Sequence, residues 1–175
     1  LDQERLLGTF FVPMTGEAER QRHDNPDGTK PSVTNGGFEQ GKDTEGGPEA
    51  WYYQRGVTLE DNDAPEGRHF VAYSNDRTGQ LAHSNQGFAI DGRRVEFLEL
   101  SFWVKTQGVR AGTKPEQVAG AAITFIDRNR SIASIYRAGP YPGTSSWTQV
   151  HERVVVPRTA HDAVIMIGLN GATGR

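Results

Sequence analysis

Aromatic rings next to polar side chains are the residues of this chain best suited to recognising a ligand. The candidates lie in three stretches: Trp51 with Tyr53, Trp103 alone, and Tyr136, Arg137 and Tyr141 around a Gly-Pro-Tyr-Pro-Gly loop. A flat ring can stack on the C–H face of a sugar, and polar neighbours can satisfy its hydroxyl groups. Side chains alternate along a strand, so we expect at least one ring of 51–53 to lie in the core.

The stretch 97–105 has the clearest two-residue alternation. One face carries Leu98, Leu100, Phe102 and Val104, and the other carries Phe97, Glu99, Ser101, Trp103 and Lys105. We expect the first face to belong to the core and Trp103 to form a sugar-stacking platform on the second. The alternative is that a loop covers Trp103, because most tryptophans are largely buried.

Residue patterns for catalysis are weak. None of the five histidines has a His-x-x-x-His zinc spacing, and no serine stands in a Gly-x-Ser-x-Gly nucleophile motif. Glu99, Asp127 and Glu152 could in principle pair as acid and base for glycoside cleavage. Carboxylates on sandwich strands are more often solvated or paired with arginine, so we expect no enzymatic activity.

Arg130 is a further candidate ligand residue. It lies in the polar turn 127–130, and its planar guanidinium suits a carboxylate or sulfate on an acidic polysaccharide. The alternative is a surface arginine that pairs with Asp127.

Short apolar stretches separated by Gly, Asn and Asp turns predict the elements that position these residues. Strands are expected at 6–12, 51–59, 68–73, 86–90, 95–105, 119–126, 131–137, 148–156 and 163–169. No helical period interrupts them, which favours an all-β antiparallel sandwich. The polar stretch 15–32 predicts a division into residues 1–32, a strand plus a connection, and a sandwich domain at 33–175.

Composition narrows the possible partners. The net charge is -3 and the pI is about 6.0, so the chain lacks the basic field that nucleic-acid binding requires. The mean hydropathy is -0.63 and the longest apolar runs are of strand length, so we expect no membrane insertion. The chain has no cysteine and opens without a signal-peptide pattern, so we expect an exported form to have lost its signal.

Several stretches together resemble a known family. They are Asn-Gly-Gly-Phe-Glu at 35–39, followed by 66–74, 98–105, 124–130, 143–147, 154–157 and 163–174. From about residue 33 to 174 the chain resembles the galactose-binding-like jelly rolls typified by carbohydrate-binding modules of families four, nine and twenty-two. The resemblance implies a jelly-roll sandwich that binds a polysaccharide or glycan. It also implies an accessory role beside an exported hydrolase, in an extracellular or periplasmic setting.

The family pattern has two further implications. It often includes a structural calcium ion near the opening strand, for which Glu39 and Asp43 would supply carboxylates here. It usually ends with a Phe-Asp-Asp-Val strand, which is not found after the Gly-Ala-Thr-Gly turn. Residues 1–6 match that strand faintly, so the N-terminal strand is a candidate to replace it.

Carbohydrate binding has one main rival. The same sandwich can act as a structural or adhesion domain in protein–protein interaction without binding sugar. Aromatic rings among polar neighbours on an outward sheet face favour sugar, whereas a face covered by loops or another strand favours the structural role.

Overall fold

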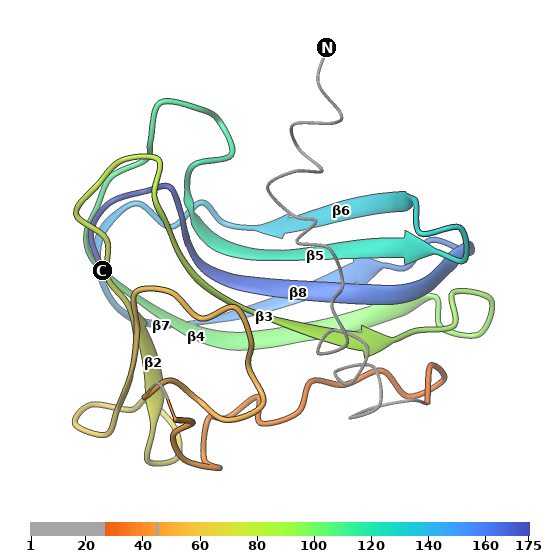
Figure 1. Cartoon of the computed structure of the whole chain (residues 1–175), viewed down its shortest axis with the longest axis horizontal. Coiled ribbons are helices and arrows are strands. Elements are labelled where there is room, and N and C mark those ends of the chain that lie inside the picture. Colours follow the sequence, from red (N-terminus) through yellow and green to blue (C-terminus); the bar gives the residue numbers. More distant parts are fainter. Residues whose placement is uncertain (1–26, 45) are drawn as a thin grey trace.

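The computed structural model describes residues 27–175 except residue 45, and these residues form antiparallel strands and no helix (Figure 1). In chain order the strands are β1 (Val57–Glu60), β2 (Phe70–Tyr73), β3 (Leu81–Ala89), β4 (Phe97–Val109), β5 (Ala119–Asp127), β6 (Ile132–Ala138), β7 (Gly143–Val155) and β8 (Ala160–Asn170). Within this described part, no helix could span a membrane. The strand expected at 6–12 lies outside the described residues.

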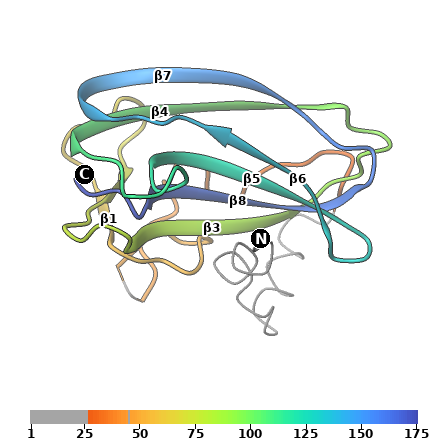
Figure 2. The ribbon, with the colours of Figure 1, turned by 90° about the horizontal axis from the view of Figure 1, so that it is seen from above.

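The strands form two main layers and a short hairpin. One layer is a four-stranded sheet in the order β3-β8-β5-β6, and the other is the pair β4-β7, which lies across it (Figure 2). The hairpin β1-β2 lies near the end of the sandwich where β8 finishes. The expected all-β antiparallel sandwich is confirmed.

The main core lies between the two layers. Phe125 of β5 is fully buried, and Ile123 on the same face lies opposite Ile165 of β8. The β4-β7 layer contributes Val154, which is 1% exposed, and the partly buried Leu98 and Leu100. Burial of these side chains from both layers supplies the main force that holds the layers together.

One predicted strand is shorter than expected. The sequence favours a strand over 51–59, but the strand observed there is the shorter Val57–Glu60. Ala50 and Tyr53 have φ angles of 65° and 52°, in the left-handed region that interrupts an extended chain. Residues 52–55 instead follow the free edge of β3, where Tyr52 exchanges two backbone hydrogen bonds of 2.9 Å with Asn85.

A buried histidine on β3 gives the fold a predicted pH dependence. Burial, assisted by the charge of Arg55, lowers the pKa of His83 to about 4. Below the ordinary pKa of about 6.5 the unfolded chain takes up a proton that the folded chain refuses, so stability falls with pH. Between pH 7 and 4.5 we expect His83 to account for a loss of about 2 kcal/mol.

Urea unfolding at both pH values, on the parent and on His83→Gln, measures this contribution. The carboxylate of Glu39, whose pKa is lowered by backbone hydrogen bonds, also loses stabilising contacts in acid. That loss is common to both proteins and cancels in the difference. An equal acid sensitivity of parent and variant would show that His83 is protonated without cost in the folded chain.

Candidate functional site

The outward face of the β4-β7 sheet carries large side chains that stay in contact with solvent. Phe97, Trp103 and Val155 keep 40%, 37% and 68% of their surface accessible. Along β4 the odd positions from 97 to 105 are exposed, whereas the even positions from 98 to 104 are half-buried. The predicted division into a core face and a solvent face is confirmed, with Trp103 on the solvent face.

A hydrogen bond from its ring edge anchors Trp103. Its Nε1 donates to Oε2 of Glu66 at 3.3 Å, and its strand partner on β7 is Gln149. Glu66 belongs to the connection between β1 and β2, residues 61–69, which we call the acidic loop. A loop thus contacts the ring, as the alternative expectation held, but more than a third of the residue stays exposed.

Two further residues of the β4-β7 sheet attach the acidic loop. Lys105 of β4 donates to Oδ2 of Asp63 at 2.5 Å. Trp147 of β7 donates through Nε1 to the backbone oxygen of Asp63 at 2.8 Å, and its ring packs edge-on against Phe70 at 5.3 Å. The loop is therefore held beside Trp103 by contacts from both strands.

These contacts also set the charge of Asp63. The hydrogen bond from Lys105 holds the pKa of Asp63 below its usual range. The hydrogen bond from Trp147 lowers this pKa further, as does the positive charge of Lys105. Asp63 therefore keeps its negative charge to a lower pH than an ordinary aspartate and is an acceptor for hydroxyl groups.

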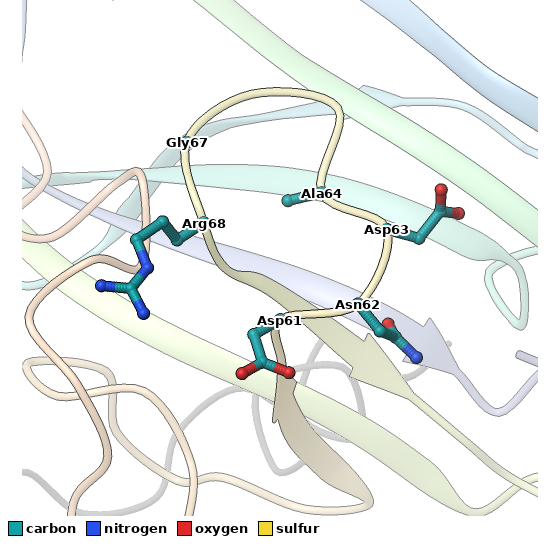
Figure 3. Close-up of a pocket in the computed structure, with 6 residues that line it drawn as sticks. All are labelled: Asp61, Asn62, Asp63, Ala64, Gly67 and Arg68. Atoms are coloured by element: carbon teal, nitrogen blue, oxygen red, sulfur yellow. The ribbon is translucent and has the colours of Figure 1, made fainter.

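The acidic loop borders an open pocket of about 350 Å³ (Figure 3). The residues that line it are Asp61, Asn62, Asp63, Ala64, Gly67 and Arg68. Carboxylates accept hydrogen bonds, the guanidinium donates them, and the amide of Asn62 does both. A small ligand with many hydroxyl groups matches this mixture, and the pocket has the volume of ordinary small-molecule sites.

Trp51, predicted as a ligand-stacking ring, is instead a core residue. It is 5% exposed, its ring packs against Phe38 at 5.6 Å, and its Nε1 donates to the backbone oxygen of Asn35 at 3.2 Å. The expectation that one ring of 51–53 is buried is met by Trp51. Its assignment to a binding site is wrong because neither face of the ring is open to a ligand.

Tyr136 and Tyr141 lie together on the inner side of the β4-β7 sheet, away from Trp103. Tyr141 packs edge-on against Phe102 at 6.1 Å, on the core-facing side of β4. Burial raises the pKa of both tyrosines, and the nearby carboxylate of Glu152 raises it further. These two predicted residues thus form a separate cluster around Glu152.

Arg137, Tyr53 and Arg130 fall at three other places. Arg137 of β6 helps to line a smaller pocket of about 140 Å³ that also includes Asn170. Tyr53 is 36% exposed and lies beside β3. Arg130 is in the exposed turn after β5, where Oδ1 of Asp127 accepts two backbone N–H groups.

The acidic residues considered for catalysis are not arranged as a pair. Glu99 lies on the outward face of β4, 3.6 Å from Arg153 of β7. Glu152 is the strand partner of Leu100 and faces the other side of the same sheet. Asp127 organises the turn after β5. Two carboxylates cannot act on one bond from opposite faces of a sheet, so this set does not form a glycosidase centre.

Glu39 and Asp43 do not fit the expected calcium ion. Oε1 of Glu39 accepts the backbone N–H groups of Arg68 at 2.8 Å and His69 at 3.0 Å. The two oxygens of Asp43 accept N–H groups from Gly47 at 3.0 Å and Gln54 at 2.6 Å. The hydrogen atoms of these N–H groups point at the carboxylate oxygens and would repel a cation bound there. The described residues contain no group of three or more metal-ligating side chains.

The acidic loop is the part of this site that the sequence did not reveal. Residues 60–63 read as an acidic turn, and no local pattern links them to Trp103. The hydrogen bonds that join Glu66 to Trp103 and Asp63 to Lys105 span 37 and 42 residues. Only the folding of the β1-β2 hairpin against the β4-β7 sheet brings these groups together.

Comparisons with known proteins returned distant structural likenesses. No family model and no curated protein matches the chain. Among solved structures, "Family 16 Carbohydrate Binding Module-2" is 12% identical over 77% of this chain and 91% of its own, with a TM-score of 0.43. A structure described as "CBM4 structure and function" is 16% identical over 82% and 92%, with a TM-score of 0.45.

A third structure is the enzymatically active domain of tailspike protein 4 from bacteriophage CBA120. It is 20% identical over 67% of this chain, with a TM-score of 0.47. The match spans only 16% of the tailspike chain.

Proposed function

We propose that this chain is a non-catalytic module that binds carbohydrate on the outward face of the β4-β7 sheet. The observation that carries the proposal is the exposed ring of Trp103 next to the polar pocket of the acidic loop. Nε1 of Trp103 donates a hydrogen bond to Glu66. In the sequence Glu66 lies between Ala64 and Gly67, two residues that line the pocket. We expect one extended ligand to contact both the ring and the pocket.

The chemistry of the two parts is complementary. A sugar ring has an apolar C–H face, which gains by stacking on an indole, and a hydroxyl rim, which needs donors and acceptors. Asp61, Asn62 and Arg68 offer both kinds of group at the pocket. Anchoring of Trp103 and of the loop before binding reduces the conformational entropy lost when a ligand is held.

The biological setting extends this proposal. A module that binds polysaccharide would keep an attached or associated hydrolase close to its polymeric substrate and raise its effective concentration there. Such a role belongs to an extracellular or periplasmic protein. The rival role, a structural or adhesion domain, requires no sugar at Trp103.

A glycan-array screen of the parent chain, Trp103→Ala and Phe97→Ala tests the proposal. We expect the parent to bind a defined group of glycans and Trp103→Ala to lose that signal. Phe97 is the matched control, because it is on the same face of β4 with a similar exposed fraction but stacks with Arg153 away from the acidic loop. Equal binding by all three proteins, or none by the parent, would refute the assignment.

The same screen run with calcium and with a chelator checks the metal separately. Because the oxygens of Glu39 and Asp43 already accept N–H groups, we expect the chelator to leave the signal unchanged. A signal that disappears on chelation would require a calcium site formed by other groups.

A further inference from the structure

Glu39 holds the arm of the acidic loop that leads into β2. Its Oε1 accepts the backbone N–H groups of Arg68 and His69 at 2.8 and 3.0 Å, and its Oε2 lies 3.1 Å from Nδ1 of His69. Gly67 lies against the same carboxylate, because a Cβ atom placed on this glycine would collide with Oε1. One carboxylate thus contacts three consecutive residues of the loop.

The acidic loop has little support from its own backbone. Residues 61–69 make no backbone-to-backbone hydrogen bond in the described part of the chain. Side chains from outside the loop hold it instead. Lys105 and Trp147 bind it at Asp63, on the side of the β4-β7 sheet, and Glu39 binds the backbone of the other arm.

The position of Glu39 is itself fixed by the core. The adjacent Phe38 packs against the buried ring of Trp51, and its N–H donates to the backbone oxygen of Asn35 at 3.1 Å. The N–H of Gln40, on the other side of Glu39, donates to Oδ1 of Asn35, also at 3.1 Å. The Glu39 side chain therefore extends toward the loop from a turn that is anchored on both sides.

Arg68 connects this contact to the proposed binding site. It lines the pocket, and its side chain and that of Asp61 project from the two arms of the loop (Figure 3). No described residue forms a hydrogen bond or an ion pair with its guanidinium, which is therefore available to sugar hydroxyl groups. Because Glu39 bonds to the backbone of Arg68, it determines the place from which this guanidinium reaches the pocket.

We propose that Glu39 is a positioning residue of the carbohydrate site, an inference that rests on the proposed function. It touches no sugar but keeps Arg68 and the rim of the pocket in place for the ligand. Hydrogen bonds from backbone N–H groups to a carboxylate are charge-assisted, and they are stronger than those between neutral groups. Because the arm is ordered before the ligand arrives, less conformational entropy is lost on binding.

Amide exchange measured by NMR on the ¹⁵N-labelled chain tests the proposal without a ligand. In Glu39→Ala the N–H groups of Arg68 and His69 lose their acceptor and should exchange on the order of 10-fold faster, while Ala119–Asp127 is unchanged. Glu39→Gln keeps an acceptor oxygen without the charge, so it should restore most of the protection. Unchanged exchange of both amides in Glu39→Ala would overturn the proposal.

Two further variants show whether the effect is specific. Gly67→Ala displaces the carboxylate of Glu39 without removing it, so the amides of Arg68 and His69 should again exchange faster. Asp43→Asn is the matched control, because the carboxylate of Asp43 accepts N–H groups outside the acidic loop. Equally fast exchange in Asp43→Asn would show a general loosening of the fold and would contradict a specific role of Glu39.

Isothermal calorimetry with the glycan selected by the array measures the effect on binding. We expect the affinity to fall roughly 10-fold in Glu39→Ala, to stay within about 3-fold of the parent in Glu39→Gln, and to be unchanged in Asp43→Asn. Parental affinity in Glu39→Ala, despite faster exchange, would overturn the positioning role. A parent that binds no glycan would refute the proposed function, whereas the exchange of Arg68 and His69 would still decide whether Glu39 orders the loop.

Discussion

Replacement of Trp103 by alanine is expected to weaken binding of the glycan selected by the array by roughly 30-fold, or about 2 kcal/mol. The ring supplies the apolar surface on which the sugar stacks, and alanine leaves only a methyl group. The fold should persist, because 37% of Trp103 is already exposed and the hydrogen bond of its indole N–H, to Glu66, lies at the surface. We expect a cost in unfolding free energy of no more than about 1 kcal/mol.

Two titrations check this result. Isothermal calorimetry on the parent and on Trp103→Ala gives the loss of affinity, and urea unfolding of both gives the change in stability. Trp103→Phe keeps a flat ring but loses the N–H group, so it should retain most of the affinity. A variant Trp103→Ala that binds as tightly as the parent, or unfolds several kcal/mol more easily, would contradict a platform role.

Replacement of Trp51 by alanine should have the opposite outcome, with a loss of about 3–5 kcal/mol in stability. Trp51 is 5% exposed in the main core, so removal of its ring leaves a cavity against Phe38. The change also leaves the backbone oxygen of Asn35 without the N–H group of the indole. The melting temperature should fall by roughly 6–20 °C.

Trp51→Phe separates the two contributions. It keeps a ring beside Phe38 but cannot donate to Asn35, so we expect it to cost about 1–3 kcal/mol. Circular dichroism melts on both variants measure these changes, and any folded fraction should bind glycan with parental affinity. Loss of binding in a variant of Trp51 that stays fully folded would return this residue to the binding site.

The sequence was most informative where side-chain alternation continues along a whole strand. Leu98, Leu100 and Phe102 form the core face of β4 and Trp103 lies on the solvent face, as the pattern from 97 to 105 predicts. Alternation alone decides this, because a strand has only two faces. The same reasoning failed around Trp51, since the positive φ angles of Ala50 and Tyr53 interrupt the strand there.

The binding site itself depends on contacts that no local pattern encodes. The pocket residues Asp61, Asn62 and Arg68 belong to a polar loop that resembles any other turn in the sequence. These residues lie beside Trp103 because the neighbouring Asp63 accepts hydrogen bonds from Lys105 and Trp147. Both donors are far along the chain, on two different strands. Likewise, the family resemblance assigns Glu39 to a calcium ion, and only the fold reveals that the N–H groups of Arg68 and His69 occupy its carboxylate.

The most direct measurement is a titration of the ¹⁵N-labelled chain with the selected glycan, observed at the three tryptophan indole N–H signals. Each indole has a different partner: Asn35 for Trp51, Glu66 for Trp103 and Asp63 for Trp147. Trp103→Ala and Trp51→Phe assign the signals by deletion. We predict the largest shift at Trp103, a smaller one at Trp147 and none at Trp51. A glycan that binds without moving the Trp103 signal would contradict carbohydrate recognition on this face.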